Sequence, residues 1–439
     1  MRTRRRTSAL AIAAGLVVSA GAGAAAAASA PAIGPQNWPV FGLYLNHNAV
    51  WGEGPAVSWQ RTTGAIANGL IVAAGRVYYG TDTGYAECLS ARTGRLIWKT
   101  KLDNWVFGPP TLVDGRVFVG TGTDVFAAPD VKGTPPSTIY ALSAATGAIL
   151  WRVDTGGEDK PSITYADGYV YAADGHGSLR KIDPATGNVV WKVADGGIAA
   201  VSPPTPYQGR IYLETGTPGH PGLRAFSART GERLWTYPEG NSDNMVTVGD
   251  GLLFAVNTLP IRSGGKSYLE DQYEAVSFNG HLVWRYTTRP GPMPVFEAPG
   301  GTEFGGVFYD GSMARPYLYA FDARTGRLRW KTRMPGGLVN HTPLVTRHYV
   351  LAVTNTAWLV AMNRSTGKIV AQWHYAANSS VGPGALTMVN HTLYLWSSER
   401  GGSGSVLGRS AVKGRPLTRG SIYAIAQAQL LSHRVPTGG

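Results

Sequence analysis

The stretch SARTGERLW at residues 227–235 decides the fold, because close copies of it recur along the chain. They read SARTGRLIW at 90–98, SAATGAILW at 143–151, DPATGNVVW at 183–191 and DARTGRLRW at 322–330. Each copy has a Thr-Gly pair and then a Trp four residues after the Gly. Repetition at a regular spacing is typical of a fold built from one supersecondary unit used many times.

Seven such turns occur, counting weaker copies at Asn279-Gly280 and Thr366-Gly367. Successive Trp residues lie 40 to 53 residues apart, which is the length of one four-stranded propeller blade. The copy at Gly367 has Ala371 in place of the Trp, so its blade is expected to be irregular. The six tryptophans that obey the spacing are Trp98, Trp151, Trp191, Trp235, Trp284 and Trp330.

Each unit reads as strand, turn, strand, loop, strand, Thr-Gly turn and strand, designated A to D in order. Gly accepts the positive φ of a tight C–D turn, and the Trp on strand D is expected to fill the gap to a neighbouring blade. The Trp ring is therefore predicted to be nearly buried, with a cost of about 3–5 kcal/mol for Trp191→Ala. Segments such as RLIW are apolar at successive positions, which predicts a strand D buried on both faces. Small residues on strand C would leave room for close approach: Ala91, Ala144, Ala228 and Ala323.

Closure of the ring is predicted from the strand that the last unit lacks. Strands at 383–426 have no Thr-Gly-Trp strand after them, whereas PAVSWQRT at 55–62 carries the unassigned Trp59 before the first unit. Pairing of the two segments would remove an open sheet edge. The prediction is an all-β, eight-bladed propeller of four-stranded antiparallel blades, with an N-terminal strand completing the last blade. The predicted organisation is a signal peptide at 1–30, an extension at 31–54, the propeller at 55–428 and a tail at 429–439.

The first thirty residues predict export. A basic start, MRTRRR, precedes an apolar run and small residues suited to cleavage. RTSAL fits the twin-arginine route poorly, so ordinary secretion is favoured. Cys88 is the one cysteine, so no internal disulfide or lipid anchor is expected, and a buried structural thiol is predicted. The expectation is a secreted or periplasmic monomer that is not a lipoprotein and has no membrane span once the signal is removed.

The charge balance is basic. The formal net charge of +13 falls to about +9 without the four arginines of the first six residues. Such a charge favours anionic partners or substrates. Because no Lys/Arg run with interleaved aromatic residues occurs, nucleic-acid binding is not expected.

The repeated A-x-x-A-x-T-G-x-x-x-W string, with NWPVFG at 37–42, resembles the PQQ-type β-propeller repeat family. The resemblance covers nearly the whole chain after the signal and implies the fold, but much less about function. Members include quinoprotein dehydrogenases, assembly factors of the BamB type and hydrolases of sulfur compounds. A quinoprotein would hold pyrroloquinoline quinone on a Trp beside a calcium ion. Its usual pair of adjacent cysteines is absent, as is a haem-binding C-x-x-C-H.

Strand direction places the B–C loops and D–A connections on one face of the ring. Long B–C loops are predicted at 121–138, 257–272, 310–317 and 397–419. The last of these is rich in Lys and Arg, and it is either a basic flap over the channel or a solvated insertion. A small polar or anionic ligand or a protein partner is expected on this long-loop face.

Candidate site residues come from the D–A segments at the predicted channel mouth. Asp243 and Glu303 are the candidate catalytic or calcium-binding carboxylates. The remaining candidates for quinone or ligand binding are Trp105, Lys160, Asn244, Asn340 and His341. A purely structural role for these polar residues is the competing interpretation.

Three functions follow as alternatives. The first is a non-catalytic ligand-binding or protein-interaction scaffold, which the sequence favours. The second is a quinone- and calcium-dependent oxidoreductase, and the third is a hydrolase that uses a carboxylate in the funnel of the propeller.

Overall fold

The structure is a computed structural model, and it describes residues 50–51, 56–64, 66, 69–123, 126–128, 131–157, 163–197, 199, 202–216, 221–238, 244–292, 300–339, 341–377, 379–382, 384–399 and 419–435. These residues are almost entirely β-structure, with one short helix, α1 (Gln427–Ser432). No helix among them is long and apolar enough to cross a membrane. The predicted signal peptide, most of the extension and most of the basic loop at 397–419 lie outside these residues.

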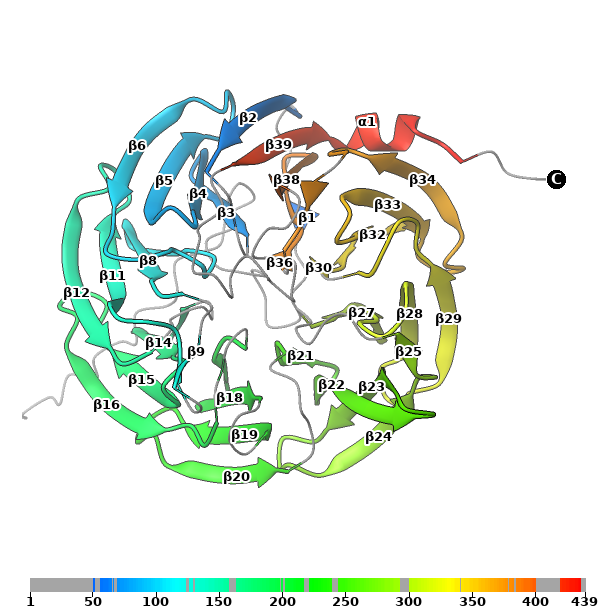
Figure 1. Cartoon of the computed structure of the whole chain (residues 1–439), viewed down its shortest axis with the longest axis horizontal. Coiled ribbons are helices and arrows are strands. Elements are labelled where there is room, and N and C mark those ends of the chain that lie inside the picture. Colours follow the sequence, from blue (N-terminus) through cyan, green and yellow to red (C-terminus); the bar gives the residue numbers. More distant parts are fainter. Residues whose placement is uncertain are drawn as a thin grey trace, which may run out of the picture.

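Eight four-stranded antiparallel sheets surround a central axis (Figure 1), which confirms the predicted eight-bladed propeller. In blades one to four the strands run A to D as β3 (Leu70–Ala73), β4 (Arg76–Gly80), β5 (Tyr85–Ser90) and β6 (Leu96–Lys101); β7 (Thr111–Val113), β8 (Arg116–Gly120), β11 (Ser137–Ser143) and β12 (Ile149–Thr155); β13 (Thr164–Ala166), β14 (Tyr169–Ala173), β15 (Ser178–Ile182) and β16 (Val189–Ala194); β17 (Thr205–Tyr207), β18 (Arg210–Thr215), β19 (Gly222–Ser227) and β20 (Arg233–Tyr237).

The other four blades follow the same order. They are β21 (Thr247–Gly249), β22 (Leu252–Ser263), β23 (Lys266–Val276) and β24 (Leu282–Thr287); β26 (Thr302–Glu303), β27 (Val307–Gly311), β28 (Tyr317–Asp322) and β29 (Leu328–Arg333); β31 (Leu344–Val345), β32 (Tyr349–Val353), β33 (Trp358–Asn363) and β34 (Ile369–His374); β37 (Thr387–Val389), β38 (Thr392–Glu399), β39 (Gly420–Ala426) and β2 (Trp59–Thr63).

Short strands complete the sheets. In the eighth blade β2 pairs antiparallel with β39, with Trp59 opposite Ala424, so this sheet combines segments from both ends of the described chain. The additional strands are β1 (Val50–Trp51), parallel to β37; β25 (Gly291–Pro292) on β23; β35 (Ser379–Ser380) on β38; the β9 (Phe126–Ala128) and β10 (Val131–Lys132) pair; and the parallel pair β30 (His341–Thr342) and β36 (Gly384–Ala385).

The A–B turns are two-residue hairpins. Asp114-Gly115 and Asp250-Gly251, for example, have positive φ at both residues, at 46° and 73° and at 47° and 79°. Two successive positive φ values define the type I′ turn, whose twist matches that of the flanking strands. The Asp-Gly pairs in the sequence therefore specify tight hairpins at this end of their blades.

The Thr-Gly-Trp repeat works across the boundary between two blades. The Trp98 indole of the first blade donates to the carbonyl of Ala144 in the second blade at 3.0 Å. A Cβ on Gly147, in the Thr-Gly turn of that second blade, would lie 2.6 Å from the Trp98 ring. The same ring-on-glycine contact recurs at six more boundaries. Its Gly–Trp pairs are Gly94–Trp59, Gly187–Trp151, Gly231–Trp191, Gly280–Trp235, Gly326–Trp284 and Gly367–Trp330.

Burial of the tryptophans is uneven. Trp98, Trp284 and Trp330 are buried, whereas Trp151, Trp191 and Trp235 are only half-buried. The prediction of a uniformly buried ring is therefore wrong for three of the six.

The prediction of a strand D buried on both faces is also wrong. Ile97 and Leu150, each directly before its Trp, are 44% and 50% exposed. Strand D is the outermost strand of its blade, so the next blade reaches the Trp but leaves the preceding apolar residues on the outer rim.

We expect Trp284→Ala to destabilise the protein by about 3–5 kcal/mol and Trp191→Ala to cost less. Trp284 is buried and donates to the Ala323 carbonyl at 2.8 Å. The Trp191 indole nitrogen has no hydrogen-bond acceptor among the described residues, and Lys181 donates to the corresponding carbonyl, that of Ala228. Urea unfolding of both variants measures the difference, and equal losses would contradict this ranking.

The seventh blade differs where Ala371 replaces Trp. The last described residues run along β34, and Ala371 forms a β-bridge with Arg434. Gln372 N donates to His433 O at 3.1 Å, and the His433 ring stacks on Trp373 at 4.9 Å. The C-terminal segment therefore covers this outer strand, and Ala371, with no exposed surface, leaves room for it. Residues predicted as a tail thus pack on the seventh blade.

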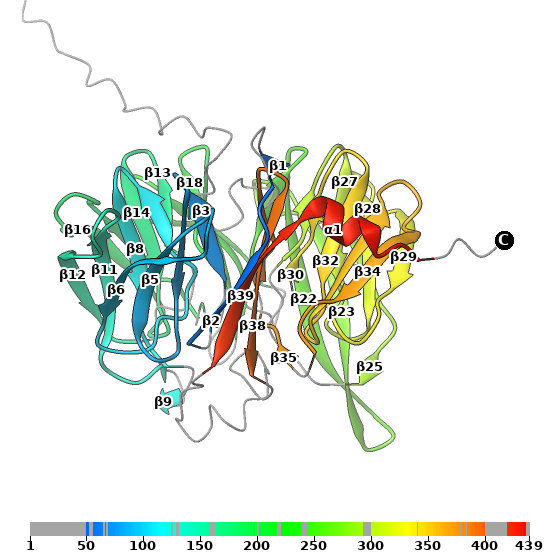
Figure 2. The same cartoon turned by 90° about the horizontal axis from the view of Figure 1, so that it is seen from above.

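The two faces of the ring differ as the strand directions predict (Figure 2). The β9 strand and the tip of the β22–β23 hairpin project from the same face. Residues 257–272 form no loop, which corrects that expectation. They extend β22 and β23 into a long hairpin, whose turn at Gly264-Gly265 has positive φ at both residues.

Candidate functional site

Three of the seven predicted site residues, Lys160, Asp243 and Asn340, lie outside the described residues. Their predicted roles stay predictions. The other four lie in separate settings, and each has its own partners.

Trp105 lies in the connection from the first to the second blade. Its ring packs on Phe107 with the centroids 5.4 Å apart, and its backbone N–H donates to the Asn104 side chain at 2.9 Å. The Asn104 amide donates in turn to the carbonyls of Thr134 and Pro136. These contacts fix the long B–C segment of the second blade, and the predicted stacking of a quinone on Trp105 stays a prediction.

Asn244 and His341 are both fully buried. The Asn244 amide donates to the carbonyl of Val256 on β22. The His341 ring lies 4.8 Å from Trp396, and burial lowers the pKa of His341 to about 3. The imidazole lies in the parallel pair of β30 and β36, which Figure 1 places near the centre of the ring, and its predicted role in ligand binding stays a prediction.

Glu303 lies at the other face from the predicted channel mouth. It belongs to β26, directly before the A–B turn, and its carboxylate accepts a hydrogen bond from Gly306 N at 2.8 Å. A Cβ on Gly249 in the fifth blade would meet this side chain at 2.6 Å. Burial raises the pKa of Glu303. The contacts seen are those of a turn cap, and a role as calcium ligand or base remains untested.

The described members of the predicted set do not come together as one quinone and calcium site. Trp105 precedes a strand A and Glu303 ends one, so the two lie at opposite faces of the ring. No three His, Cys, Asp or Glu side chains within the described ranges gather as metal ligands. Cys88 is buried, as predicted, and burial raises the pKa of its thiol to about 12.

The carboxyl groups that do approach each other lie between the fifth and sixth blades, at the long-loop end. Asp271 on β23 accepts hydrogen bonds from the hydroxyl groups of Thr258 and Ser312 and from Ala314 N. It thereby holds the B–C loop of the sixth blade against the fifth. Both Asp271 and Asp310 are inaccessible to solvent or nearly so, at 0% and 2%.

Asp310 has far fewer hydrogen bonds. Its Oδ1 accepts from Gly311 N at 2.6 Å, and its Oδ2 has no hydrogen-bond partner among the described residues. Burial and the nearby Asp271 raise the pKa of Asp310 well above its ordinary value of 3.8. Burial raises the pKa of both carboxyl groups, and the three donors to Asp271, against one to Asp310, make Asp310 the one that holds its proton more tightly.

Aromatic groups complete the surroundings of Asp310. Tyr319 lies opposite it on β28, and the Tyr273 hydroxyl donates to the Gly311 carbonyl at 3.1 Å. The D–A connection covers the loop end of β27, because a Cβ on Gly311 would lie 2.5 Å from Val339. Asp310 is therefore a buried carboxyl group on β27, and burial favours its protonated form.

Asp310 is absent from the predicted site residues, although the sequence marks it as an exception to the repeat. The fourth position of strand B is apolar or aromatic in the other blades and a carboxylate only here, within FYD at 308–310. A lone acid at a core position of a repeat is a departure that packing does not explain. The equivalent residues are Tyr79, Val119, Ala172, Leu213, Ala255, Ala352 and Leu395.

The family model described as outer membrane protein assembly factor BamB matches residues 46–134, 136–292 and 271–435. The chain belongs to this family. A tetrathionate hydrolase of Acidithiobacillus ferrooxidans is 26% identical over 358 residues, which cover 76% of this chain and 71% of that protein. The BamB of Nitrosomonas eutropha is 25% identical over 274 residues, covering 56% of this chain and 58% of its own length.

Solved structures agree on the fold. BamB from Moraxella catarrhalis has a TM-score of 0.56 at 16% identity and covers 84% of this chain and 100% of its own. A quinohemoprotein alcohol dehydrogenase from Comamonas testosteroni has a TM-score of 0.63 at 14% identity, with coverages of 88% and 80%. At such low identity these similarities establish the propeller and carry no argument about activity.

Proposed function

We propose that this chain hydrolyses a small anionic sulfur compound and that Asp310 is its proton donor. The observation that carries the proposal is the state of Asp310, a buried carboxyl with one oxygen unpartnered among the described residues and a pKa raised by burial. A carboxylic acid kept neutral by an apolar site is a common device for general acid catalysis.

A protonated Asp310 suits an anionic substrate for two reasons. A neutral acid does not repel the anion, whereas an ionised carboxylate at the same place would. The chain is also basic, with 40 Lys and Arg against 27 Asp and Glu, and such a balance attracts anions.

The proposed step is acid-assisted cleavage of a sulfur–sulfur bond. The oxygen of a water molecule bonds to a sulfonate sulfur, and the adjacent sulfur–sulfur bond breaks. The departing sulfur takes the proton of Asp310, and a proton from the attacking water restores the acid. Atoms and charge balance with water as the one co-reactant, so the step needs no oxidant or reductant.

Similarity to the tetrathionate hydrolase supports this substrate class, because the alignment spans three quarters of the chain. The predicted hydrolase used a funnel carboxylate, and the proposal transfers that role from Asp243 and Glu303 to Asp310. A quinone-dependent oxidoreductase gains no support from the contacts of Trp105 and Glu303. The test is hydrolysis of tetrathionate by the wild type and by Asp310→Asn, and its expected results open the Discussion.

A scaffold that binds a protein partner is the second candidate. Its support is the outer rim of blades one to five, where apolar side chains of strand D are 42–51% exposed. Exposed large apolar side chains in such number are a frequent mark of protein–protein contact. The rim residues are Leu96, Ile97, Ile149, Leu150, Val189, Val190, Leu234, Leu282 and Val283.

For this second candidate we expect a photo-crosslinking residue at position 150 to give one discrete protein adduct in cells that produce the chain. Leu150 is a rim residue that is 50% exposed, so a partner covering it would be captured. The matched control is the same residue at the exposed position 229, on a C–D turn outside the rim, which should give no such adduct. Equal adducts at both positions, or none at position 150, would count against the scaffold.

A further inference from the structure

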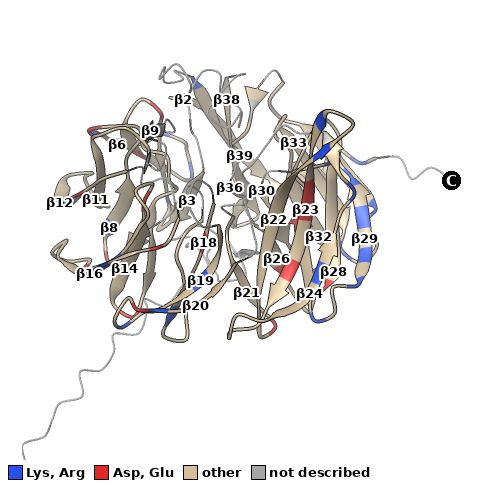
Figure 3. Cartoon of the chain, turned by 60° about the horizontal axis from the view of Figure 1, so that its bottom comes forward, with Lys and Arg blue, Asp and Glu red and all other residues tan. Residues whose placement is uncertain are grey.

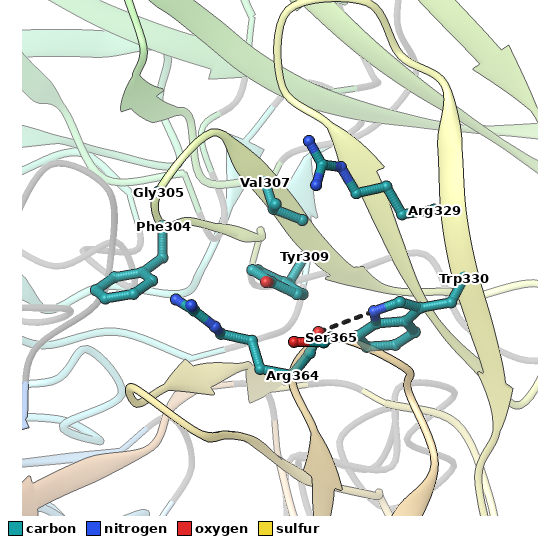
Figure 4. Close-up of a pocket in the computed structure, with 8 residues that line it drawn as sticks. All are labelled: Phe304, Gly305, Val307, Tyr309, Arg329, Trp330, Arg364 and Ser365. Carbon is teal, nitrogen blue, oxygen red and sulfur yellow. Dashed lines mark hydrogen bonds between the residues drawn. The ribbon is translucent and has the colours of Figure 1, made fainter.

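A pocket between the sixth and seventh blades lies at the opposite face from Asp310. Its volume is about 190 Å³. It lies where the A–B turn of the sixth blade meets the C–D turn of the seventh, and Figure 4 shows Tyr309 in its middle. The lining residues are Phe304, Gly305, Val307, Tyr309, Arg329, Trp330, Arg364 and Ser365.

Strand B of the sixth blade begins with a shorter residue than strand B of the first and fourth blades. In the first and fourth blades strand B begins with Arg76 and Arg210, whose guanidinium groups donate to carbonyls of the next blade. Val307 holds this position in the sixth blade, as its register opposite Asp322 shows. A short apolar side chain replaces a long one there, and the groove stays open.

The seventh blade contributes a cationic side chain, Arg364, to this groove. Arg364 lies on the C–D turn of the seventh blade, at a position that is Ala in several other blades. Its carbonyl accepts from the Trp330 indole at 3.0 Å, as the Ala144 carbonyl does from Trp98 (Figure 4). Its guanidinium lies over the Phe304 ring, 5.1 Å from the centroid, and has no ion pair within the described part of the chain.

The surroundings of Arg364 favour an anion. Arg329 also lines the pocket, although it is paired with Asp322 at 2.7 Å. Lys331 and Arg333 follow it on β29, and Figure 3 shows the basic residues of this strand along the outside of the sixth blade. The Glu303 carboxyl group, on the same turn, accepts from Gly306 N, and burial raises its pKa.

We propose that this pocket binds a small carboxylate with a flat apolar body. Arg364 would hold the carboxylate, with the Tyr309 hydroxyl as a second donor, and the rings of Phe304 and Trp330 would flank the body. A cavity of about 150 Å³ accepts benzene, so the volume suffices for a ring of that size. The site is separate from Asp310 and does not depend on the proposed hydrolysis.

The test is isothermal titration of the full-length protein with benzoate, with benzyl alcohol as the uncharged analogue. We expect saturable binding of benzoate and none of benzyl alcohol. Arg364→Ala should weaken benzoate roughly tenfold or more, since it removes a charge-assisted contact. Ala is the residue of the repeat at this position, so the variant should fold. Arg229→Ala, which removes a charge from the fourth blade, should bind as the wild type does.

Val307→Arg is the second variant, because it restores the arrangement of the first blade and fills the groove. It should abolish benzoate binding while the melting temperature is kept. No benzoate binding by the folded wild type would overturn the proposal. So would equal binding of benzyl alcohol, which would make the pocket merely apolar, or unchanged binding by Val307→Arg, which would place the ligand elsewhere.

Discussion

Asp310→Asn is expected to lower the rate of tetrathionate hydrolysis at least about a hundredfold, because general acid catalysis contributes roughly 10²–10⁴-fold to a rate. Asparagine has the shape of a protonated aspartic acid but has no acidic proton to give. Sulfate released from tetrathionate by this step, separated by ion chromatography, measures the loss.

The pH dependence follows from the raised pKa of Asp310. The donor must be protonated, so activity should persist above pH 3.8, where an ordinary Asp is ionised, and should fall as the pH rises through the higher pKa of the folded state. An activity that instead appears only as the carboxyl ionises would mean that Asp310 acts as a base.

The same variant should be more stable than the wild type near neutral pH. Because Asp310 binds its proton more tightly when folded, the unfolded state holds fewer protons above pH 3.8 and stability declines as the pH rises. The amide of the Asp310→Asn variant does not titrate, so the difference in melting temperature should shrink toward pH 3.8 and below. A gain in stability with a loss of activity is the pattern of a functional buried acid.

Asp154→Asn is the matched control, since Asp154 is exposed on β12 and 73% of its side-chain surface is accessible. It should match the wild type in both assays. A folded wild type that leaves tetrathionate intact would refute the proposed substrate, and full activity in Asp310→Asn would refute the proposed donor.

The fold could be predicted from the sequence because each short copy of the repeat specifies contacts with neighbouring blades. A Gly and a Trp four residues apart each meet a different neighbouring blade, so the string specifies both boundaries of its own blade. The positions of Trp98 and Gly147 were therefore predictable, and so was the number of blades. Trp191 is one exception, because its indole nitrogen has no hydrogen-bond acceptor among the described residues, and Lys181, a side chain outside the string, donates to the corresponding Ala228 carbonyl.

The outer rim could not be read in the same way. Ile97 is apolar, and an apolar residue before a Trp indicates burial only if another sheet covers it. Coverage depends on how far each blade twists away from the next, which single strands do not specify. The exposure of Ile97 and the burial of Ala371 under the C-terminal segment are both consequences of assembly.

The candidate site is harder to predict than the fold, because polar residues are numerous in the connections between blades. Their partners depend on the conformations of the loops. The prediction places Glu303 at the channel mouth, whereas it ends β26 directly before the A–B turn, because the sequence does not specify where strand A lies along the chain. His341, a predicted ligand-binding residue, is packed against Trp396, a contact that the sequence does not indicate. Asp310 was visible as a departure from the repeat, and comparison of the eight B strands position by position would have found it.

Gly326→Ala is expected to destabilise the protein by about 2–5 kcal/mol, the sum of a backbone and a packing cost. Gly326 has a φ of +69°, and an L-residue in this region costs about 1–2 kcal/mol. A Cβ there would also lie 2.6 Å from the Trp284 ring, which is buried and cannot retreat without opening the boundary between the fifth and sixth blades. Overpacking of this kind costs about 1–3 kcal/mol.

Gly251→Ala separates the two costs. Gly251 has a similar φ of +79°, but a Cβ there would meet no atom within 4 Å, so this variant should lose only the backbone share. Urea unfolding of both variants gives the difference, which is the free energy of the glycine-on-tryptophan contact between blades. If both substitutions lower the free energy of unfolding equally, the ring of Trp284 moves aside without cost. The Gly of the repeat is then required only by its turn. A larger loss at Gly326 means that the Gly is selected by the neighbouring blade as well, and the same comparison then applies to every boundary where a Thr-Gly turn meets a Trp.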